Sequence, residues 1–396
     1  MKKSNKRLVE IMIVVFISTF IGMLGGAATI YTIDYNNKKE NNIDVSKIDE
    51  IDSVFDKIVD DYYDNVDKNK LIEGAISGML SVLDEHTAYI DKNATTSFNN
   101  KMRGEYYGIG IEALTLEGTG ILVVEVTSGS PAERSGIKPD DIIIDANGKS
   151  LKNESASYFT SLVSTTKEEM KLVISRSGRN LNISVKPEKV IIPSVTTNKF
   201  VVEGKRIGYI KISLFAANTD TQFATKLNEL EQNGIDSLII DVRNNAGGYL
   251  SSVSTILEMF MKKGTILYNT ETKSSQTARK DTTDEFRDYP VAVLTNGSSA
   301  SASEILAACF KENFNSDIVG NTTYGKGTVQ EVINVLEGSS AKLTTKKWLT
   351  PSGEWINEKG LTPTIRVTLS NNYQENPTYE NDNQLEKAIK ALTMKK

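Results

Sequence analysis

The hydrophobic pattern divides the chain into successive regions. Residues 11–33 form an almost unbroken apolar run without charges, and residues 45–96 carry apolar side chains at helical spacing. From about residue 104 to 190, short apolar runs separated by turn residues are typical of β-strands. Beyond residue 200, strand-like and helix-like runs alternate. The pattern predicts an apolar N-terminal segment, a helical region, a small β domain and a larger α/β domain.

The N-terminal run is long enough to cross a membrane. Three lysines and one arginine lie within residues 2–7, directly before it. Roughly 20 apolar residues span a bilayer, and flanking cations keep their end in the cytoplasm. We therefore expect a cytoplasmic N-terminus (1–10), a single-pass anchor in the cell membrane (11–33) and the rest of the chain on the extracytoplasmic side. The alternative is a cleaved signal peptide with small residues at 25–28, although signal cores are shorter, about 7 to 15 residues.

The helical region begins after a polar linker, and together they occupy residues 34–103. Ile48, Ile51, Val54 and Ile58 lie on one face at helical spacing. We expect a helical subdomain that packs on the rest of the chain or on a second copy.

Residues 104–190 carry the signature of a peptide-binding β domain. The wording SPAERSGIKPDDIIIDANG within this region resembles a PDZ domain. In such domains a glycine-containing loop offers backbone N–H groups to a peptide carboxylate, while the peptide adds a strand to the sheet edge. The alternative is a glycine-rich strand start without a ligand. The loop expected to bind substrate here consists of Tyr107, Gly108, Ile109, Gly110 and Ile111.

Residues 191–370 alternate between strands and helices, which predicts a layered α/β core with parallel strands. We expect strands at 206–213, 237–241, 291–295 and 317–320, and helices at 219–232, at 250–261 and after Ser301. A β-hairpin around Gly338 is expected within 329–349. The tail, residues 371–396, is polar and ends in a short helix.

Composition narrows the classes of partner. A chain of 396 residues is long enough for two or three domains, and 46 basic against 51 acidic residues give a net charge of −5. This charge does not favour a nucleic-acid partner. The one cysteine, Cys309, excludes an internal disulfide, and no spacing of Cys and His is typical of a metal site. We expect neither metal nor cofactor.

Two short segments carry the candidate chemistry. Residues 296–304 read NGSSASASE and offer a serine at the start of an apolar helical run, and residues 324–330 read YGKGTVQ. The one histidine, His86, lies in a different segment more than two hundred positions upstream. If a serine is the nucleophile, lysine is the obvious group to take its proton.

These segments identify a family resemblance. SASASE, YGKGTVQ, DVRNNAGG (241–248) and TPSGEWINEKGLTP (350–363), in this order and with a PDZ-like insertion, resemble the C-terminal processing peptidases, serine proteases of family S41. The resemblance implies Ser301 as nucleophile, Lys326 as general base and Gln330 as its helper. It also implies a crotonase/ClpP-like α/β protease core, with the inserted PDZ-like domain, the helical N-terminal region and the transmembrane helix. Protein or peptide substrates would bind through their C-termini, the PDZ domain can gate activity, and the helical ends can pair into a homodimer.

The physical chemistry of these residues agrees with that assignment. A serine at a helix N-terminus lies where the helix dipole favours negative charge, and the N–H groups of Ala302 and of Gly247 in the Gly247–Gly248 turn are the expected oxyanion hole. A free lysine has a pKa of about 10.4, and burial can lower it enough to supply a neutral amine. We expect the flanking glycines to let the Lys326 segment pass close to Ser301.

Each feature also has a simpler interpretation. Ser301 and Glu304 fit a helix-capping box, and Lys326 alone fits a solvated turn. His86, in a family segment where Glu85 replaces a proline, is interpreted as structural, and Cys309 as a packed apolar residue. Trp355 is expected to alter substrate fit. Residues 241–245 are expected to brace the oxyanion loop through Asp241, Arg243 and Asn245. The alternative function is an inactive, membrane-tethered PDZ scaffold that binds protein C-termini.

Overall fold

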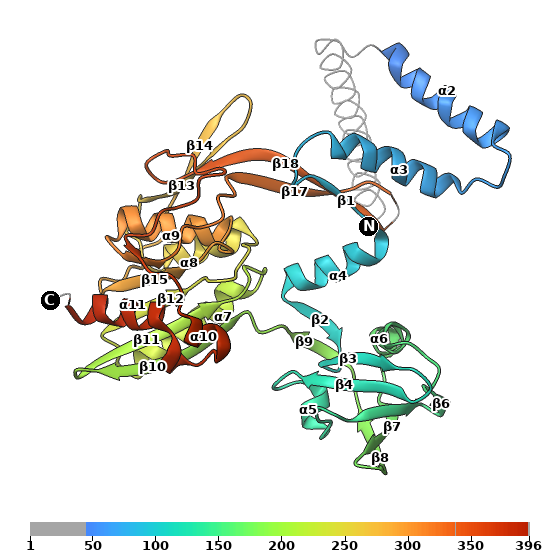
Figure 1. Cartoon of the computed structure of the whole chain (residues 1–396), viewed down its shortest axis with the longest axis horizontal. Coiled ribbons are helices and arrows are strands. Elements are labelled where there is room, and N and C mark those ends of the chain that lie inside the picture. The colour runs from blue at the N-terminus through green and yellow to red at the C-terminus, as the bar shows by residue number, and fades with distance from the viewer. Residues whose placement is uncertain (1–44, 337, 395–396) are drawn as a thin grey trace, which may run out of the picture. The chain divides into compact units, whose positions relative to one another are not determined.

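The computed structural model describes residues 45–336 and 338–394 (Figure 1). The chain forms two compact units, one up to Met79 and one from Leu80. This boundary falls inside the predicted region 34–103. The predicted cytoplasmic end (1–10) and membrane anchor (11–33) lie outside the described residues. Within the described ranges, no helix is both long and apolar enough to cross a membrane.

From Val45 onward, where the description of the chain begins, the first unit contains α2 (Val45–Asp61) and most of α3 (Lys68–Ser81). The prediction of amphipathic helices here is confirmed. The apolar stripe of α2 remains exposed: Ile48, Ile51 and Val54 each expose more than half of their surface.

A β domain follows α4 (Lys92–Arg103). Its main sheet has the order β3-β4-β5-β7-β8, with β6 paired to β5, while β2 and β9 form a separate antiparallel pair. Ile121, Ile143, Leu172 and Ile174 point into its core and are almost completely buried. The predicted β domain is confirmed. Its elements are β2 (Glu105–Gly108), β3 (Ile111–Leu116), β4 (Gly120–Val126), α5 (Pro131–Arg134), β5 (Ile142–Ala146), β6 (Lys149–Ser150), α6 (Ala156–Thr165), β7 (Met170–Arg176), β8 (Arg179–Val185) and β9 (Glu188–Ile191).

The α/β core is built on a six-stranded sheet of order β10-β11-β12-β15-β16-β19. β11 to β19 run parallel, as predicted, while β10 pairs antiparallel with β11 at one edge. The strands are β10 (Val195–Val202), β11 (Lys205–Ile212), β12 (Ser237–Asp241), β15 (Val291–Thr295), β16 (Asp317–Gly320) and β19 (Ile365–Arg366). The helices are α7 (Thr219–Gln232), α8 (Leu250–Glu258), α9 (Ala302–Asn313), α10 (Asn371–Glu375) and α11 (Asn383–Met394), with the 3₁₀ helix η1 (Tyr379–Asn381).

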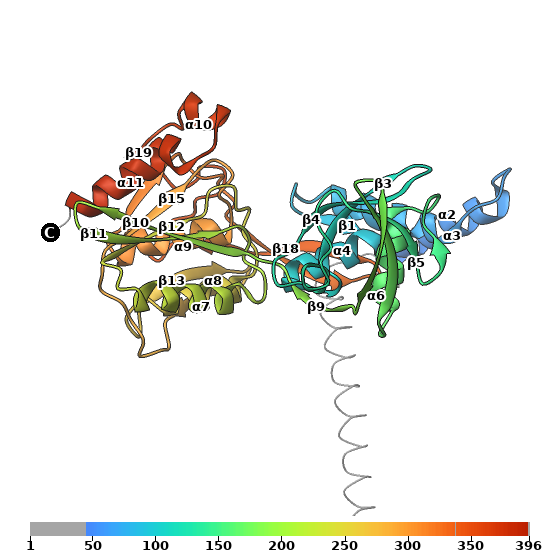
Figure 2. The ribbon, with the colours of Figure 1, turned by 90° about the horizontal axis from the view of Figure 1, so that it is seen from below.

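Both faces of this sheet are covered, so its strands are apolar on both sides. Ile240 and Val293 face α7, α8 and α9, whereas Ile239 and Leu294 face α11 on the opposite side (Figure 2). The C-terminal helix that the sequence predicts after Leu385 therefore closes one face of the core.

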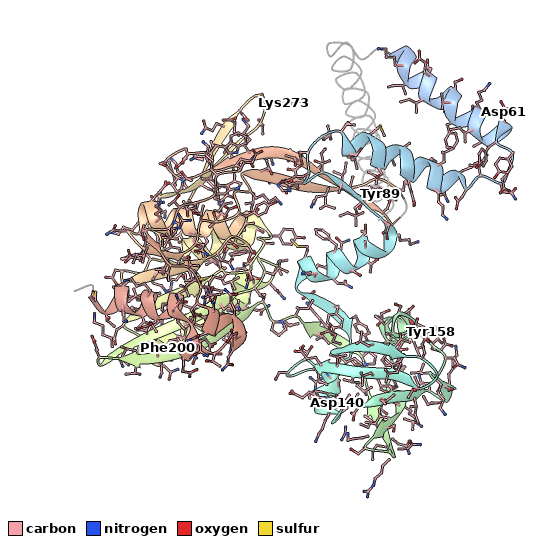
Figure 3. All side chains as sticks on the ribbon, in the orientation of Figure 1. Asp61, Tyr89, Asp140, Tyr158, Phe200 and Lys273 are labelled. Atoms are coloured by element: carbon pink, nitrogen blue, oxygen red, sulfur yellow. The ribbon has the colours of Figure 1, made fainter. Side chains whose placement is uncertain are left out.

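A second sheet adjoins the core and was largely unforeseen. It has the order β1-β18-β13-β14, with β17 paired to β18. The predicted hairpin is confirmed as β17 and β18, but the helical prediction is wrong for residues 88–90. These residues form strand β1, which carries Tyr89 (Figure 3) and pairs antiparallel with β18, because pairing with a distant edge outweighs local helical spacing. The strands are β1 (Ala88–Ile90), β13 (Ile266–Glu271), β14 (Gln276–Lys280), β17 (Thr328–Asn334) and β18 (Ser340–Leu349).

Candidate active site

Ser301 is the N-cap of α9, at the end of a turn that follows the buried strand β15. Its backbone has φ 54° and ψ −115°, a conformation that is costly for a residue with a side chain and that is concentrated at functional sites. The neighbouring serines are fully buried, and their hydroxyls donate to main-chain carbonyls, Ser299 to Val242 and Ser303 to Asn245, both at 2.8 Å. Of these three serines, Ser301 alone is partly exposed.

The Glu304 carboxylate connects the serine segment to the lysine segment. Its Oε2 accepts from the N–H of Ser301 at 2.8 Å and from the N–H of Lys326 at 2.9 Å. The two backbone nitrogens therefore lie no farther apart than the sum of these distances. Glu304 is fully buried, and burial raises its pKa against the opposing effect of its hydrogen bonds.

The capping box that the sequence predicts is present, but it explains only part of this arrangement. Glu304 Oε1 also accepts from Thr323 Oγ1 at 2.5 Å and from the N–H of Gly325 at 2.7 Å. A helix cap does not require these contacts with a segment about twenty residues downstream. The one available signal in the sequence was a carboxylate at the start of an otherwise apolar helix.

The backbone around Lys326 is held by hydrogen bonds on both sides. The Trp348 indole donates to the Lys326 carbonyl at 2.6 Å, and the Trp355 indole donates to the Gly327 carbonyl at 2.9 Å. A Cβ at Gly327 would lie 2.6 Å from the Trp355 Nε1, and one at Gly325 would lie 2.8 Å from the backbone nitrogen of residue 360. The glycines thus allow close packing on 355–360, whereas the sequence interpretation related them to the approach to Ser301.

The Lys326 side chain is half-buried, and this burial lowers the pKa of its amine. The positive charge of Lys342 lowers that pKa further, while Glu304 and Asp84 oppose the shift. In the part of the chain that the structure describes, no hydrogen bond joins this amine to the Ser301 hydroxyl. Catalytic hydrogen bonds are often long or poorly aligned without substrate, so the pairing of Lys326 with Ser301 stays a prediction.

Gln330 lies on β17 beside a β-bulge between Val329 and Gln330. Its Nε2 donates to Thr328 Oγ1 at 2.9 Å and to Thr344 Oγ1 at 3.0 Å. Thr344 Oγ1 in turn donates to Asp84 Oδ1 at 3.2 Å. The site therefore includes a segment that the sequence interpretation had placed apart from it.

His86 belongs to this segment and lies near the lysine loop. Its ring centroid is 6.5 Å from that of Tyr324, and burial followed by the charge of Lys326 lowers the pKa of its imidazole. The interpretation of His86 as structural stays a prediction. Although His86 is far from the candidate lysine along the sequence, the fold brings the two close together. The pairing of β1 with β18 brings it there, and no local pattern indicates that pairing.

The loop after β12 packs directly on the turn that carries Ser301. A Cβ at Gly247 would lie 2.8 Å from both the Ala300 carbonyl oxygen and the Ser301 Cβ, so this approach requires glycine. The N–H of Gly247 donates to Asn245 Oδ1 at 2.8 Å. Gly247 can therefore serve an oxyanion only if this hydrogen bond opens, and its role stays a prediction, as does that of Ala302.

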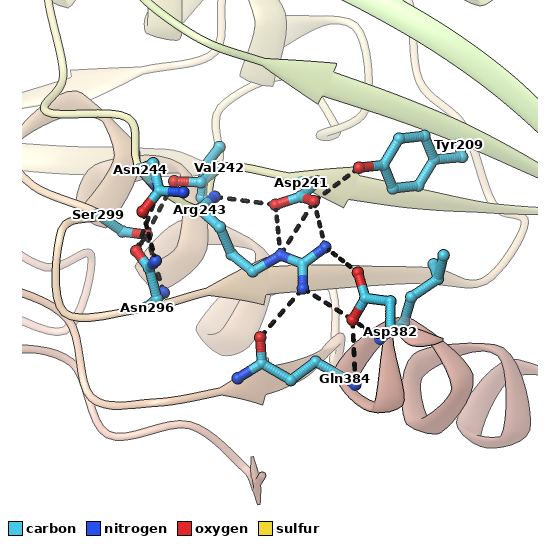
Figure 4. A network of polar contacts seen from close by, with 10 residues as sticks. Tyr209, Asp241, Val242, Arg243, Asn244, Asn296, Ser299, Asp382 and Gln384 are labelled. Atoms are coloured by element: carbon cyan, nitrogen blue, oxygen red, sulfur yellow. Dashed lines mark hydrogen bonds and ion pairs between the residues drawn. The ribbon is translucent and has the colours of Figure 1, made fainter. Parts of the chain in front are cut away.

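Arg243 braces this loop from a buried network (Figure 4). Its guanidinium lies 2.6 Å from Asp241 and 2.7 Å from Asp382, and it also donates to Gln384 at 3.0 Å. Burial opposes its charge, but the two carboxylates outweigh burial and raise its pKa. The sequence predicted the brace from 241–245. It did not predict that the tail supplies Asp382 and Gln384.

The β domain contains a groove at the predicted peptide loop. A cavity of about 70 Å³ is lined by the whole loop, Tyr107 to Ile111, together with Phe159 and Val163 of α6. The Lys167 amine lies 3.8 Å from the centre of the Tyr107 ring, near one side of this groove. The cavity has room for one small apolar side chain.

Three family models match the chain. The model described as Peptidase family S41 matches residues 206–367, and that of the PDZ domain matches residues 96–186. A third, described as the Activating protease CtpB N-terminal domain, matches residues 16–94. Ser301, Lys326 and Gln330 all lie within the first match.

Relatives of known name are similar over most of the chain. The Carboxy-terminal processing protease CtpB of Bacillus subtilis (strain 168) is 38% identical over 335 residues, which cover 83% of this chain and 70% of that protein. The Carboxy-terminal processing protease CtpA of the same strain is 33% identical over 398 residues, covering 96% and 84%. A solved structure of a Bacteroides fragilis protein described as an S41 protease shares the fold, with a TM-score of 0.50, 15% identity and coverage of 79% and 87%.

Proposed function

The chain belongs to peptidase family S41 and is a carboxy-terminal processing serine protease with a PDZ domain, and from this premise we propose that Ser301, Lys326 and Gln330 form its catalytic centre. The observation that carries the proposal is the shared Glu304 carboxylate, which holds the Ser301 and Lys326 backbones on one oxygen. A scaffold that only binds peptides has no need for a lysine of lowered pKa beside a strained serine.

The proposed reaction is acyl transfer through the Ser301 oxygen. The neutral Lys326 amine takes the hydroxyl proton as Oγ attacks the scissile carbonyl carbon, and the resulting ammonium then protonates the leaving amine. Water, deprotonated by the same amine, next attacks the carbonyl carbon of the acyl-enzyme. The ammonium returns this proton to Ser301 Oγ as the ester bond breaks and the new C-terminus leaves. Gln330 orients the amine throughout.

The oxyanion of each tetrahedral intermediate forms at the N-terminus of α9. The Ala302 N–H and one N–H of the Gly247–Gly248 turn are the proposed donors, and the helix dipole adds to their effect. A lost donor of this kind costs about 2.7 to 4 kcal/mol in transition-state energy.

The PDZ domain is proposed to hold the C-terminal end of the substrate. The loop residues 107–111 line the small cavity, which fits a C-terminal residue with a small apolar side chain. A peptide with a free carboxylate should therefore be cleaved at lower concentration than the same peptide with an amidated end. Equal KM values for the two peptides would contradict this role.

The site of action is also proposed, from the sequence. Residues 11–33 have the length and flanking charge of an anchor, which would place the catalytic region on the extracytoplasmic side of the cell membrane. The exposed apolar stripe of α2 supports the proposal that two copies pair through their helical regions.

Hydrolysis of casein by the purified full chain tests the catalytic assignment. We expect Ser301→Ala and Lys326→Ala to abolish turnover, and Gln330→Ala to lower kcat. Lys273→Ala, which removes an exposed lysine between β13 and β14, is the matched control and should retain full activity. Turnover in Lys326→Ala equal to that of the wild type would remove lysine as the base while leaving Ser301 as the nucleophile.

A further inference from the structure

A hydrogen-bond chain leads from Gln330 to a carboxylate outside the catalytic motifs. Gln330 Nε2 donates to Thr344 Oγ1 at 3.0 Å, and Thr344 Oγ1 donates to Asp84 Oδ1 at 3.2 Å. Asp84 lies outside the residues that match the S41 family model. These hydrogen bonds therefore connect the Asp84 carboxylate, from the N-terminal part of the sequence, to Gln330, which is proposed to orient the Lys326 amine.

The fold fixes each link of this chain. Gln330 and Thr344 are cross-strand partners on β17 and β18, next to a register shift at which the extra residue, Thr345, lies on β18. Asp84 begins the turn before β1, and β1 adds to the other edge of β18. Within the turn, the N–H of His86 donates to Asp84 Oδ1 at 2.8 Å. The Thr87 hydroxyl accepts from the N–H of Thr344 and so links the turn to β18.

The carboxylate sets the direction of every hydrogen bond in the chain. An ionised carboxylate only accepts, so the Thr344 hydroxyl must give its proton to Asp84. That hydroxyl can then only accept from Gln330, which requires the NH₂ group of the amide at this position. Thr328 Oγ1 takes the second N–H of the same group. The amide oxygen Oε1 is left over, and among the described residues none donates to it.

We propose that Asp84 is a positioning residue, which acts through Thr344 to keep the Gln330 amide oxygen free to accept from the Lys326 amine. This inference rests on the proposed roles of Lys326 and Gln330. With the oxygen accepting an N–H of the neutral amine, the nitrogen lone pair is free to turn towards the Ser301 hydroxyl. An amide in the flipped orientation would instead present N–H groups that compete for that lone pair.

The charge of Asp84 has a second, separable effect on the lysine. The charged groups that act on the Lys326 amine are Lys342, Glu304 and Asp84, and Asp84 raises its pKa. Glu85 is not among them and pairs instead with His86 at 3.5 Å. His86 also interacts with the Lys326 charge, and Asp84 acts on the pKa of its imidazole in the same direction as on the lysine. Removing the Asp84 charge therefore lowers the pKa of Lys326 further. Because the neutral amine is the active form, the acid limb of the activity profile moves to lower pH.

The test measures kcat and KM for one peptide across pH with the full-length Asp84→Ala variant, which removes both the acceptor and the charge. We expect the plateau kcat to fall about tenfold, the worth of one ordered hydrogen bond, with the acid limb at lower pH and KM unchanged. Glu85→Ala removes a neighbouring, exposed charge and should leave the profile in place. An Asp84→Ala profile that superposes on that of Glu85→Ala would overturn the proposal.

Thr344→Val separates the two effects, because it breaks the chain and keeps the charge. We expect a similar loss of plateau kcat with the acid limb in its wild-type position. The double variant should lose no more than either single variant, since both break one chain. Losses that multiply would show two independent structural defects and so contradict the inference.

The outcome separates this inference from the catalytic proposal. Activity abolished in Ser301→Ala and Lys326→Ala, together with a wild-type profile in Asp84→Ala, removes only the role of Asp84. Turnover retained in the serine and lysine variants removes the catalytic proposal itself. A cooperative melting transition of Asp84→Ala above the assay temperature confirms that the compared enzymes are folded.

Discussion

Asp382 connects the C-terminal tail to the loop that packs on the Ser301 turn. A substitution of Asp382 therefore tests how much this connection contributes to stability. Its carboxylate is 2% exposed and accepts from the Arg243 guanidinium at 2.7 and 3.0 Å. The same carboxylate accepts from the N–H of Leu385 at 3.0 Å, in the first turn of α11. Asp382→Ala removes both functions and leaves Arg243 with Asp241 as the remaining carboxylate.

The expected cost follows from these two losses. Breaking a buried ion pair by removing one partner costs about 3 to 5 kcal/mol, and the value here lies near the lower end because Asp241 still pairs with Arg243. The lost cap adds about 1 kcal/mol. The sum, about 4 kcal/mol, is a large part of a typical stability of about 5 to 15 kcal/mol.

Asp382→Asn is the more conservative change. Its amide oxygen can still cap α11 and accept one hydrogen bond from Arg243, so the charge and the second hydrogen bond from Arg243 are lost. We expect a cost of about 1.5 to 3 kcal/mol, the worth of a hydrogen bond to a charged group. The alanine variant should therefore be clearly less stable than the asparagine variant.

Urea unfolding followed by tryptophan fluorescence measures both costs, since Trp348 and Trp355 are the chain's two tryptophans and both lie in the second unit. A Ser301→Ala background prevents self-digestion. Asp284→Ala is the matched control, because Asp284 is 87% exposed and pairs with Lys263 on the surface, where ion pairs contribute about 0 to 1 kcal/mol. An Asp382→Ala cost no larger than that of Asp284→Ala would refute the reasoning.

Three further changes test other parts of the site. Gly247→Ala should lower kcat about a hundredfold, because its Cβ would lie 2.8 Å from that of Ser301. Gly264→Ala, also at positive φ but with no atom within 4 Å of the added Cβ, should keep wild-type kcat, and similar kcat values in the two variants would exclude the steric cause. Lys326→Met should abolish hydrolysis yet raise the melting temperature at pH 7, because burial lowers the pKa of this lysine in the folded state and the buried ammonium destabilises the wild type. This destabilisation is complete below the folded pKa and vanishes above the unfolded pKa of about 10.4, so a rise in melting temperature that persists unchanged above that pH would contradict the cause. Trp355→Phe should lower kcat about threefold to tenfold in the same peptide assay, because the Gly327 carbonyl loses its indole donor. A raised KM with unchanged kcat would instead favour the sequence-based expectation that Trp355 alters substrate fit.

The sequence was most informative where local pattern and tertiary environment agree. The helix predicted at 219–232 and the strand predicted at 237–241 match α7 and β12 in both bounds. Each carries the period of a single element, and the parallel strands are buried on both faces, so their apolar runs were unambiguous. The serine and lysine segments could be found for a similar reason, since each is a short contiguous motif.

The sequence was uninformative where a contact depends on distant pairing. Strand β14 (QTARK) presents no apolar run that would indicate a strand, and the apolar run of β13 is only three residues long, Ile266 to Tyr268. β1 was hidden in a region of helical spacing. Asp84 enters the site only through the pairing of β1 with β18, and Asp382 only because α11 covers the far face of the sheet. Neither position carries a local signal for its role.

The way in which Lys326 is held follows from what a lysine base requires. A carboxylate paired with its amine would favour the ammonium and raise its pKa, which is the opposite of what a base needs. In the part of the chain that the structure describes, the Lys326 amine makes no ion pair; its backbone is held instead, by Glu304 at the N–H and by Trp348 at the carbonyl. Four donors surround the Glu304 oxygens and oppose the rise in its pKa that burial causes, and those donors include the backbones of both Ser301 and Lys326. Precise placement of Lys326, the proposed base, and a low pKa of its amine are thus compatible. The contacts that place this lysine act on its main chain and leave its side chain half-buried and without an ion pair among the described residues.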